Sequence, residues 1–343
     1  IAEAVGRQMR LLENYNLFDI FTNGPADEIA EAVADLAPLP RARVFLTSSG
    51  SDAVDTALKL ARLTFQRSGQ PDRQVVVSRT LSYHGTNIGG TALQGLPLNR
   101  AGWGHLLVGV ETVAHDDLDA ARALFADRGD EIAAVIAEPV IGAGGVHPAT
   151  TEYLAGLRAL CDEHGALLVF DEVITGFGRL GWWFAGGLHG VTPDMLTFAK
   201  AVTSGYQPLG GVVVGARVRE VLEAEDSYIL RHGYTYSGHA TACAAGLANL
   251  ALLRDEALLD RVPAIARRLG GGLARLRDDG LIASVRGQGG VWAAGMHDDV
   301  DAVAVRDEML HRGVIARPIG PATLASGAFG RAAVPSGAST PSG

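Results

Sequence analysis

Short, nearly continuous apolar runs alternate along the chain with stretches in which apolar residues recur every three or four positions. Runs of the first kind are typical of strands buried on both faces, and the intervening spacing predicts helices. The predicted strands are residues 43–47, 74–78, 105–109, 133–137, 166–170, 195–199 and 211–215. This alternation predicts an α/β fold with a mainly parallel sheet covered by helices.

The pattern changes in the last third of the chain. Helical spacing over residues 238–253 and 258–276 is followed by a predicted hairpin of 282–286 and 291–295, a helix over 302–311 and an extended stretch at 314–317. We therefore expect an N-terminal segment over residues 1–25, a large domain over 26–257 and a small α+β domain over 258–325. Residues 326–343 are rich in Gly, Ala, Ser and Pro, which predicts a disordered tail.

Composition narrows the class of protein. With 29 basic and 38 acidic residues, the net charge of −9 argues against a nucleic-acid-binding surface. Two cysteines exclude a disulfide framework, and ten scattered histidines show no metal-binding spacing. No apolar run approaches the roughly 18 residues that a membrane span needs, and the charged first ten residues do not resemble a signal peptide. We expect a cytoplasmic enzyme that acts on small molecules, without a metal and without a membrane or nucleic-acid partner.

Lysine is nearly absent from the chain. Of the 29 basic residues only Lys59 and Lys200 are lysines. Lys59 falls on the polar side of a helical pattern, which indicates a solvated position. Lys200 ends an apolar run and precedes a glycine-containing loop, so it is expected to be partly desolvated, which favours the neutral amine that can form an imine with a carbonyl. Burial against a carboxylate, without any chemistry, is the alternative.

Asp171 comes directly after the predicted strand 166–170. In open α/β sheets, ligands bind at the carboxyl ends of the strands. Combined with an imine-forming lysine, a carboxylate there indicates pyridoxal phosphate, whose ring nitrogen needs an acid partner to stay protonated. A metal-binding or helix-capping role for Asp171 is the alternative.

Two further segments are weak indications of a pyridoxal phosphate site. Residues 47–51, Thr-Ser-Ser-Gly-Ser, lead into a predicted helix, and such a helix start can bind a phosphate through its hydroxyls and free amides. Serine and glycine also cap many helices that bind nothing. Tyr83 follows another strand and could cover a flat ring, although a simple turn explains it equally well.

One glycine motif favours a different class, a nicotinamide-dependent oxidoreductase. Residues 176–181, Gly-Phe-Gly-Arg-Leu-Gly, match the dinucleotide-binding pattern. Five residues separate this motif from the strand, however, and no helix start follows it. The tight strand-to-helix turn that such cofactors require is therefore not expected here.

Taken together, the segments resemble the class III pyridoxal-phosphate-dependent aminotransferases, which have the aspartate aminotransferase fold, fold type I. Seven stretches occur in the family's order across about residues 10 to 320. They include SYHG at 82–85, FDEVITGFGRLG at 170–181, PDMLTFAK at 193–200 and YTYSGH at 234–239, and the others are 47–62, 138–145 and 203–210.

The resemblance implies a role for individual residues. Lys200 would form the Schiff base with the cofactor and later shuttle a proton, Asp171 would pair with the ring nitrogen, and Arg317 would meet a substrate carboxylate. The site would be shared across a homodimer and bind small-molecule amine and keto acid substrates. The further cofactor contacts would be Ser49, Gly50, Ser51, Tyr83 and Val173 from one subunit and Thr235 from its neighbour.

Within the family, Ala143 and Ile174 stand where ornithine-type relatives have Glu and Gln. The chain therefore looks closer to the ω-amino acid and amine:pyruvate transaminases. Diaminopelargonate or ornithine-type transamination, a decarboxylase and an aminomutase are alternatives within the class. Family members usually begin earlier and end differently, so a truncated homologue that binds the cofactor with little turnover is the other expectation.

Overall fold

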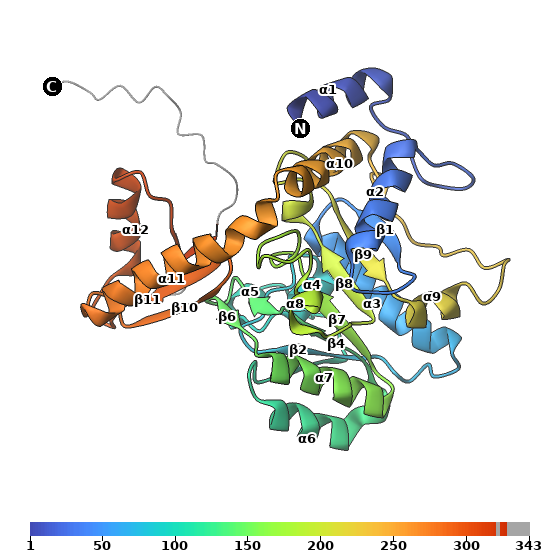
Figure 1. Ribbon diagram of the computed structural model, residues 1–343. Coiled ribbons are helices and arrows are strands. Elements are labelled where there is room, and N and C mark those ends of the chain that lie inside the picture. Colours follow the sequence, from blue (N-terminus) through green and yellow to red (C-terminus); the bar gives the residue numbers. More distant parts are fainter. Residues whose placement is uncertain (320–322, 328–343) are drawn as a thin grey trace.

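The large sheet of the computed structural model has seven strands and forms the centre of the molecule (Figure 1). The structure describes residues 1–319 and 323–327. Strand β9 is antiparallel to both of its neighbours, while the other pairs are parallel, which confirms the predicted α/β class with a mainly parallel sheet. In spatial order the strands are β1 (Arg43–Thr47), β9 (Gly210–Val214), β8 (Met195–Phe198), β7 (Leu167–Asp171), β4 (Ile132–Ala137), β2 (Val75–Arg79) and β3 (Val110–Val113).

Helices cover both faces of this sheet because its strands are apolar on both sides. Successive side chains of a strand point to opposite faces, so Val75 and Val77 enter one core and Val76 enters the other. The first core is closed by α2 (Gly24–Leu36), α6 (Leu118–Arg128), α7 (Thr151–His164) and α10 (Ala240–Asp255). The second is closed by α3 (Gly50–Arg67), α4 (Ile88–Leu93) and α9 (Ala216–Leu222).

The shorter elements lie around this framework. Helix α1 packs against α10, and β5 and β6 form a two-stranded ribbon. The bounds of these elements are α1 (Ala2–Leu11), α5 (Pro97–Arg100), β5 (Val140–Ile141), β6 (His147–Pro148) and α8 (Ala185–His189).

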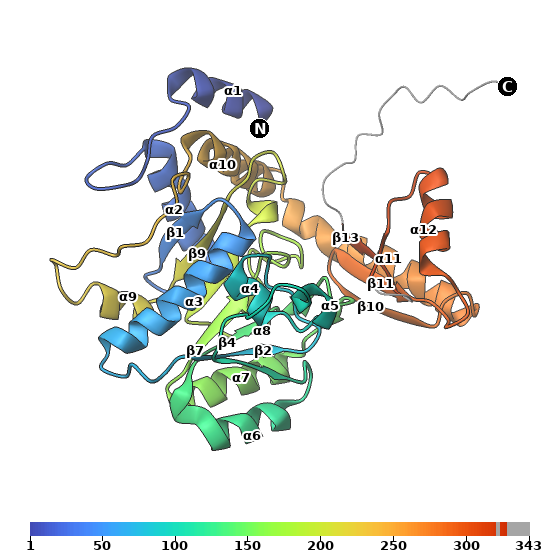
Figure 2. The same cartoon turned by 180° about the vertical axis from the view of Figure 1, so that it is seen from behind.

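A second sheet stands beside the large one, on the side away from α3 and α9 (Figures 1 and 2). Its four strands follow the order β10, β11, β13, β12, and all its pairs are antiparallel. Helices α11 and α12 pack against it around a small apolar core of its own. The bounds are α11 (Val262–Asp278), β10 (Ser284–Gln288), β11 (Val291–Gly295), α12 (Ala302–His311), β12 (Arg317–Pro318) and β13 (Thr323–Gly327).

One predicted strand is wrong. Residues 105–109 form no strand, and β3 begins at Val110 instead. Gly109 has φ +75°, a left-handed conformation that turns the chain immediately before it joins the sheet. Its carbonyl then accepts a hydrogen bond from Val76 N at 2.9 Å.

The predicted helix over 258–276 is also divided, into a 3₁₀ turn at Leu258–Arg261 and α11, in whose first turn Pro263 stands. Strand β13 extends two residues past the expected end of the small domain, and residues 328–343 of the predicted tail lie outside the described residues. Among the helices described, none has the length and apolar character needed to cross a membrane.

The covering helices hold the sheet by apolar burial, and α7 offers a direct test. Leu157 of α7 is fully buried in the first core, whereas Glu163 on the same helix is exposed. We expect Leu157→Ala to lower the free energy of unfolding by about 2–5 kcal/mol, because it removes buried methyl groups and leaves a cavity. Glu163→Ala is the matched control and should change it by less than about 0.5 kcal/mol in denaturant titrations. Equal effects of the two substitutions would contradict the packing of α7 on the sheet.

Candidate active site

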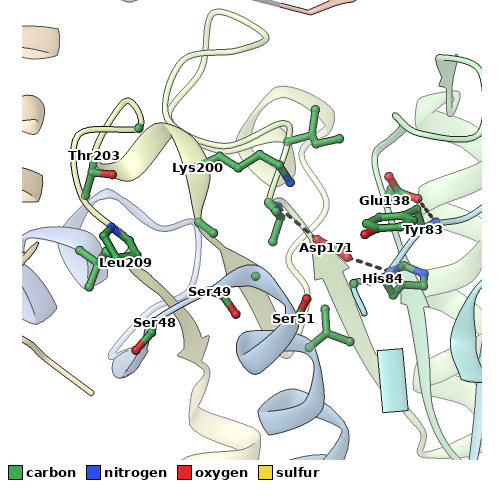
Figure 3. Close-up of a pocket in the computed structure, with 18 of the residues that line it drawn as sticks. Ser48, Ser49, Ser51, Tyr83, His84, Glu138, Asp171, Lys200, Thr203 and Leu209 are labelled. Carbon is green, nitrogen blue, oxygen red and sulfur yellow. Dashed lines mark hydrogen bonds and ion pairs between the residues drawn. The ribbon is translucent and has the colours of Figure 1, made fainter. Parts of the chain in front are cut away.

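A cavity of about 500 Å³ opens at the carboxyl ends of the central parallel strands, beside the start of α3 (Figure 3). Strand β7 ends in Asp171, the turn after β8 carries Lys200, and Glu138 follows β4. The cavity therefore lies where ligands bind in open α/β sheets. It brings together seven of the nine residues predicted for the site: Ser49, Gly50, Ser51, Tyr83, Asp171, Val173 and Lys200.

Asp171 is held rigidly at the cavity wall. Its side chain is 5% exposed, and Oδ2 lies 2.8 Å from His84 Nδ1. Oδ1 accepts hydrogen bonds from Thr197 Oγ1 at 3.1 Å and from Val173 N at 3.2 Å. A buried carboxylate is tolerated only when its oxygens are satisfied in this way. The contacts from three segments fix the direction in which Asp171 faces a ligand.

Lys200 lies across the cavity in an unusual backbone conformation. Its φ is +46°, which is uncommon for a residue with a side chain, and it begins a 3₁₀ turn over Lys200–Val202. Solvent reaches the side chain through the cavity, yet the walls exclude enough water to lower the pKa of the Lys200 amine. The negative charges of Asp171 and Glu138 oppose this shift. Burial therefore favours the neutral, nucleophilic form of the amine, and the charges of the two acids limit how far its pKa falls.

The start of α3 forms a cradle of small residues and free backbone amides. Ser49 caps the helix, and its Oγ accepts a hydrogen bond from Asp52 N at 3.1 Å. A Cβ added to Gly50 would lie 2.9 Å from Val173 Cγ1. Gly85 has φ +93°, and a Cβ there would lie 2.8 Å from the Cα of Ser51. The backbone approaches this closely only because both positions are glycine.

Glu138 connects the cavity to the segment that carries Tyr83. The carboxylate is 3% exposed, accepting from Tyr83 N at 2.9 Å through Oε1 and from Gly142 N at 3.0 Å through Oε2. Burial raises the pKa of Glu138. Tyr83 is thereby held with its ring at the cavity wall, as Figure 3 shows.

Sequence reasoning did not assign a role to three residues of this network: His84, Glu138 and Thr197. All three stand within segments that carried the family resemblance, which was the one available signal. Thr197 is a buried strand residue, and only the pairing of β7 with β8 brings its hydroxyl to Asp171.

Two predicted residues do not line the cavity. Thr235 is exposed in the segment between α9 and α10, where the neighbouring Tyr234 donates to Asp52 O at 3.3 Å. Arg317 is exposed at the start of β12 in the second sheet. The structure thus places both outside the cavity of this single chain.

The glycine motif at 176–181 forms no dinucleotide-binding turn. Gly178 N donates to Trp182 O at 3.0 Å, so the segment folds back on itself, and the next helix begins only at Ala185. The carbonyl of Arg179 accepts a hydrogen bond from Gly290 N at 2.8 Å. This loop therefore contacts the turn between β10 and β11 of the second sheet and does not form a nucleotide-binding site.

Comparison with known proteins agrees with this geometry. Residues 1–326 match the family Aminotransferase class-III. The chain is 40% identical over 307 residues to a probable aminotransferase of Mycobacterium tuberculosis, covering 84% of this chain and 66% of that protein. It is 38% identical over 312 residues to a putrescine–pyruvate aminotransferase of Pseudomonas aeruginosa, covering 85% and 68%. The chain thus spans about two thirds of the length of these curated relatives.

A solved structure extends the likeness to the fold. The crystal structure of an amine transaminase from an uncultivated Pseudomonas species superposes with a TM-score of 0.89 at 34% identity, over 94% of this chain and 80% of that one. The resemblance inferred from the sequence motifs is confirmed at the level of family and fold.

The lowered pKa of Lys200 can be measured directly, because the chain has only two lysines. We expect acetylation of Lys200 by acetic anhydride, followed against pH by peptide mass spectrometry, to reach half its maximal rate below the pH typical of a lysine amine. Exposed Lys59 is the internal reference for labelling. Asp171→Asn should lower the midpoint further, since it removes a charge that stabilises the ammonium form. A Lys200 midpoint above that of a free lysine amine would contradict this electrostatic account.

Proposed function

The chain belongs to the class III aminotransferases, and from that premise we propose that it transfers an amino group from an amine or an ω-amino acid to a keto acid such as pyruvate, using pyridoxal phosphate. The observation that carries the proposal is the placement of Lys200 and Asp171 on the walls of one cavity that the start of α3, with Ser49, Gly50 and Ser51, also lines. The relatives named for putrescine and pyruvate and for β-alanine and pyruvate support this substrate class.

The residues of the cavity fit the cofactor. A hydrogen-bonded carboxylate at Asp171 suits a protonated ring nitrogen, since the pair is charge-assisted. Free amides after Ser49, at the start of an 18-residue helix, suit a phosphate. Tyr83 and Val173 supply flat and branched apolar surfaces for the two faces of the ring. Lys200 would carry the cofactor through its side-chain nitrogen.

When bound, pyridoxal phosphate supplies an electron sink for the pair of electrons that remains after a substrate carbon loses a proton. The chain's own residues prepare that step. Asp171 would keep the proton on the ring nitrogen, and its hydrogen bonds with His84 and Thr197 hold its carboxylate in place. Burial lowers the pKa of the Lys200 amine and so favours its neutral form, which would accept the substrate proton at Nζ and return it to the cofactor side of the new bond. Tyr83 and Val173, which line the cavity, would exclude water from the ring faces.

The lining of the cavity includes an apolar side chain that we propose faces the substrate. Ile174 lines the cavity next to Val173, at the position where ornithine-type relatives have Gln. An apolar side chain there favours the hydrocarbon part of an amine over a second charged group. Arg317 stays a prediction for the substrate carboxylate.

The lining residues all fall between positions 48 and 209, inside the predicted large domain of 26–257, which we propose as the cofactor domain. A cytoplasmic location stays a prediction from composition.

The proposed function is tested by the visible absorption spectrum and by turnover. Adding pyridoxal phosphate to the purified chain should produce a lysine-bound cofactor band that Lys200→Ala lacks. An amine should bleach this band and pyruvate should restore it.

Turnover should respond to the two central residues differently. Lys200→Arg should lower kcat by ~1000-fold or more with the fold intact, because a guanidinium cannot bond the cofactor's aldehyde. Asp171→Asn should lower it by a factor on the order of 100 with cofactor still bound. A folded, dimeric wild-type chain that shows no band would refute the proposed function.

We also propose that the active site is shared across a homodimer, as predicted for Thr235. Thr235 is exposed beside Tyr236, which is 61% exposed, and further large apolar side chains are exposed at Phe18, Ile20 and Tyr206. Such surfaces are typical of a face that a second copy covers. Thr235 would then reach the phosphate cradle of the neighbouring subunit.

Mixed dimers test this sharing. Lys200→Ala and Thr235→Asp should each be inactive alone, the second because its carboxylate repels a phosphate. Co-expressed, they should recover about a quarter of wild-type activity, since half of a random mixture of dimers has one intact site of two. Recovery no greater than the sum of the two separate variants would show that each site belongs to a single chain.

A further inference from the structure

The turn that carries Lys200 needs an external support. Lys200 at φ +46° is followed by Ser204 at φ +49°, and left-handed conformations of residues other than glycine cost about 1 kcal/mol or more each. Strand β8 ends at Phe198, so its ladder does not hold this segment. Such conformations persist only where the surroundings determine them.

A side chain on a distant helix supports this turn with three hydrogen bonds, in addition to the burial of Val202 in the first core. Asn249 of α10 is 3% exposed, and its Nδ2 donates to Ala201 O at 2.8 Å and to Val202 O at 3.0 Å. Its Oδ1 accepts from Ser204 Oγ at 2.8 Å. All three partners lie within four residues after Lys200, and together they use both amide hydrogens and the amide oxygen.

The chemistry of this contact is specific to asparagine. Two carbonyl oxygens need donors and one hydroxyl needs an acceptor, and a neutral amide of this length supplies both. An aspartate would offer only acceptors and would place a charge against the carbonyls. An apolar side chain would remove the hydrogen bond to the carbonyl of Val202, which is a buried residue.

We propose that Asn249 is a positioning residue for amino transfer, whose amide holds the turn after Lys200 and so keeps the lysine side chain directed into the cavity. The inference rests on the proposed function for its role in the reaction, but the contact itself is a property of the cofactor-free chain. A merely structural Asn249 would stabilise α10 without affecting the lysine.

Hydrogen exchange of the cofactor-free chain tests the contact. In Asn249→Ala, the backbone amides of residues 200–206 should exchange about tenfold faster or more, because the turn loses its bonds to α10. Thr241→Val is the matched control. Thr241 is a buried polar residue on the same helix, and its hydroxyl donates to Glu13 O at 2.9 Å, away from the lysine turn. This control should leave exchange at 200–206 unchanged.

Acetylation of Lys200 against pH is the second readout. Loosening of the turn lets water reach the amine, so the labelling midpoint of Lys200 in Asn249→Ala should rise toward that of an ordinary lysine, while the control keeps the wild-type midpoint. Should Asn249→Ala fail to fold, Ser204→Ala removes one of the three hydrogen bonds from an exposed position and should speed exchange at 200–206 about threefold.

Unchanged exchange at 200–206 together with an unchanged labelling midpoint, in whichever of the two variants folds, would overturn the proposal. Neither readout requires cofactor. A wild-type chain that forms no cofactor band would therefore refute the proposed function and leave the test of the contact intact.

Discussion

Burial of the Asp171 carboxylate is the interaction on which the rest of the site depends. Removing a carboxylate from water is so unfavourable that its oxygens must find donors, and here the donors come from three places. His84 follows β2, Thr197 belongs to β8, and Val173 lies in the loop after Asp171 itself. Satisfying one charge therefore fixes the relative positions of three segments at the edge of the sheet.

The same arrangement sets the electrostatics of the cavity. Glu138 follows β4, the strand between β2 and β7, so a second buried acid stands near the first, and burial raises the pKa of Glu138. Lys200 faces both acids. The charges of Asp171 and Glu138 limit how far burial lowers the pKa of the Lys200 amine. Glu138 also accepts the hydrogen bond from Tyr83 N, so the same carboxylate acts on the lysine and holds the segment that carries Tyr83.

How far the sequence alone predicts this site depends on how many residues separate the two partners of each interaction along the chain. Strand ends are local features, so the apolar runs that precede Asp171 and Lys200 were enough to bring both to one edge of a parallel sheet. The error at residues 105–109 was local too, because an apolar run does not reveal the left-handed turn at Gly109. The contacts of Asn249 and His84 could not be predicted, since their partners are 45 or more residues away and no periodicity encodes a side-chain contact between elements.

The scarcity of lysine also has a structural explanation. Several arginines use the planar fork of the guanidinium to bond two backbone carbonyls at once. Arg73 donates to Ile132 O and His164 O, and Arg217 donates to Ala166 O and Gly165 O, in each case where a helix or turn passes into a strand. A lysine has one nitrogen and cannot span two such carbonyls in a fixed plane. Arginine therefore suits the positions that hold the scaffold together, whereas the cavity needs an amine that can lose its proton. Among the residues lining that cavity, Lys200 is the basic side chain that can do so and then bond to carbon.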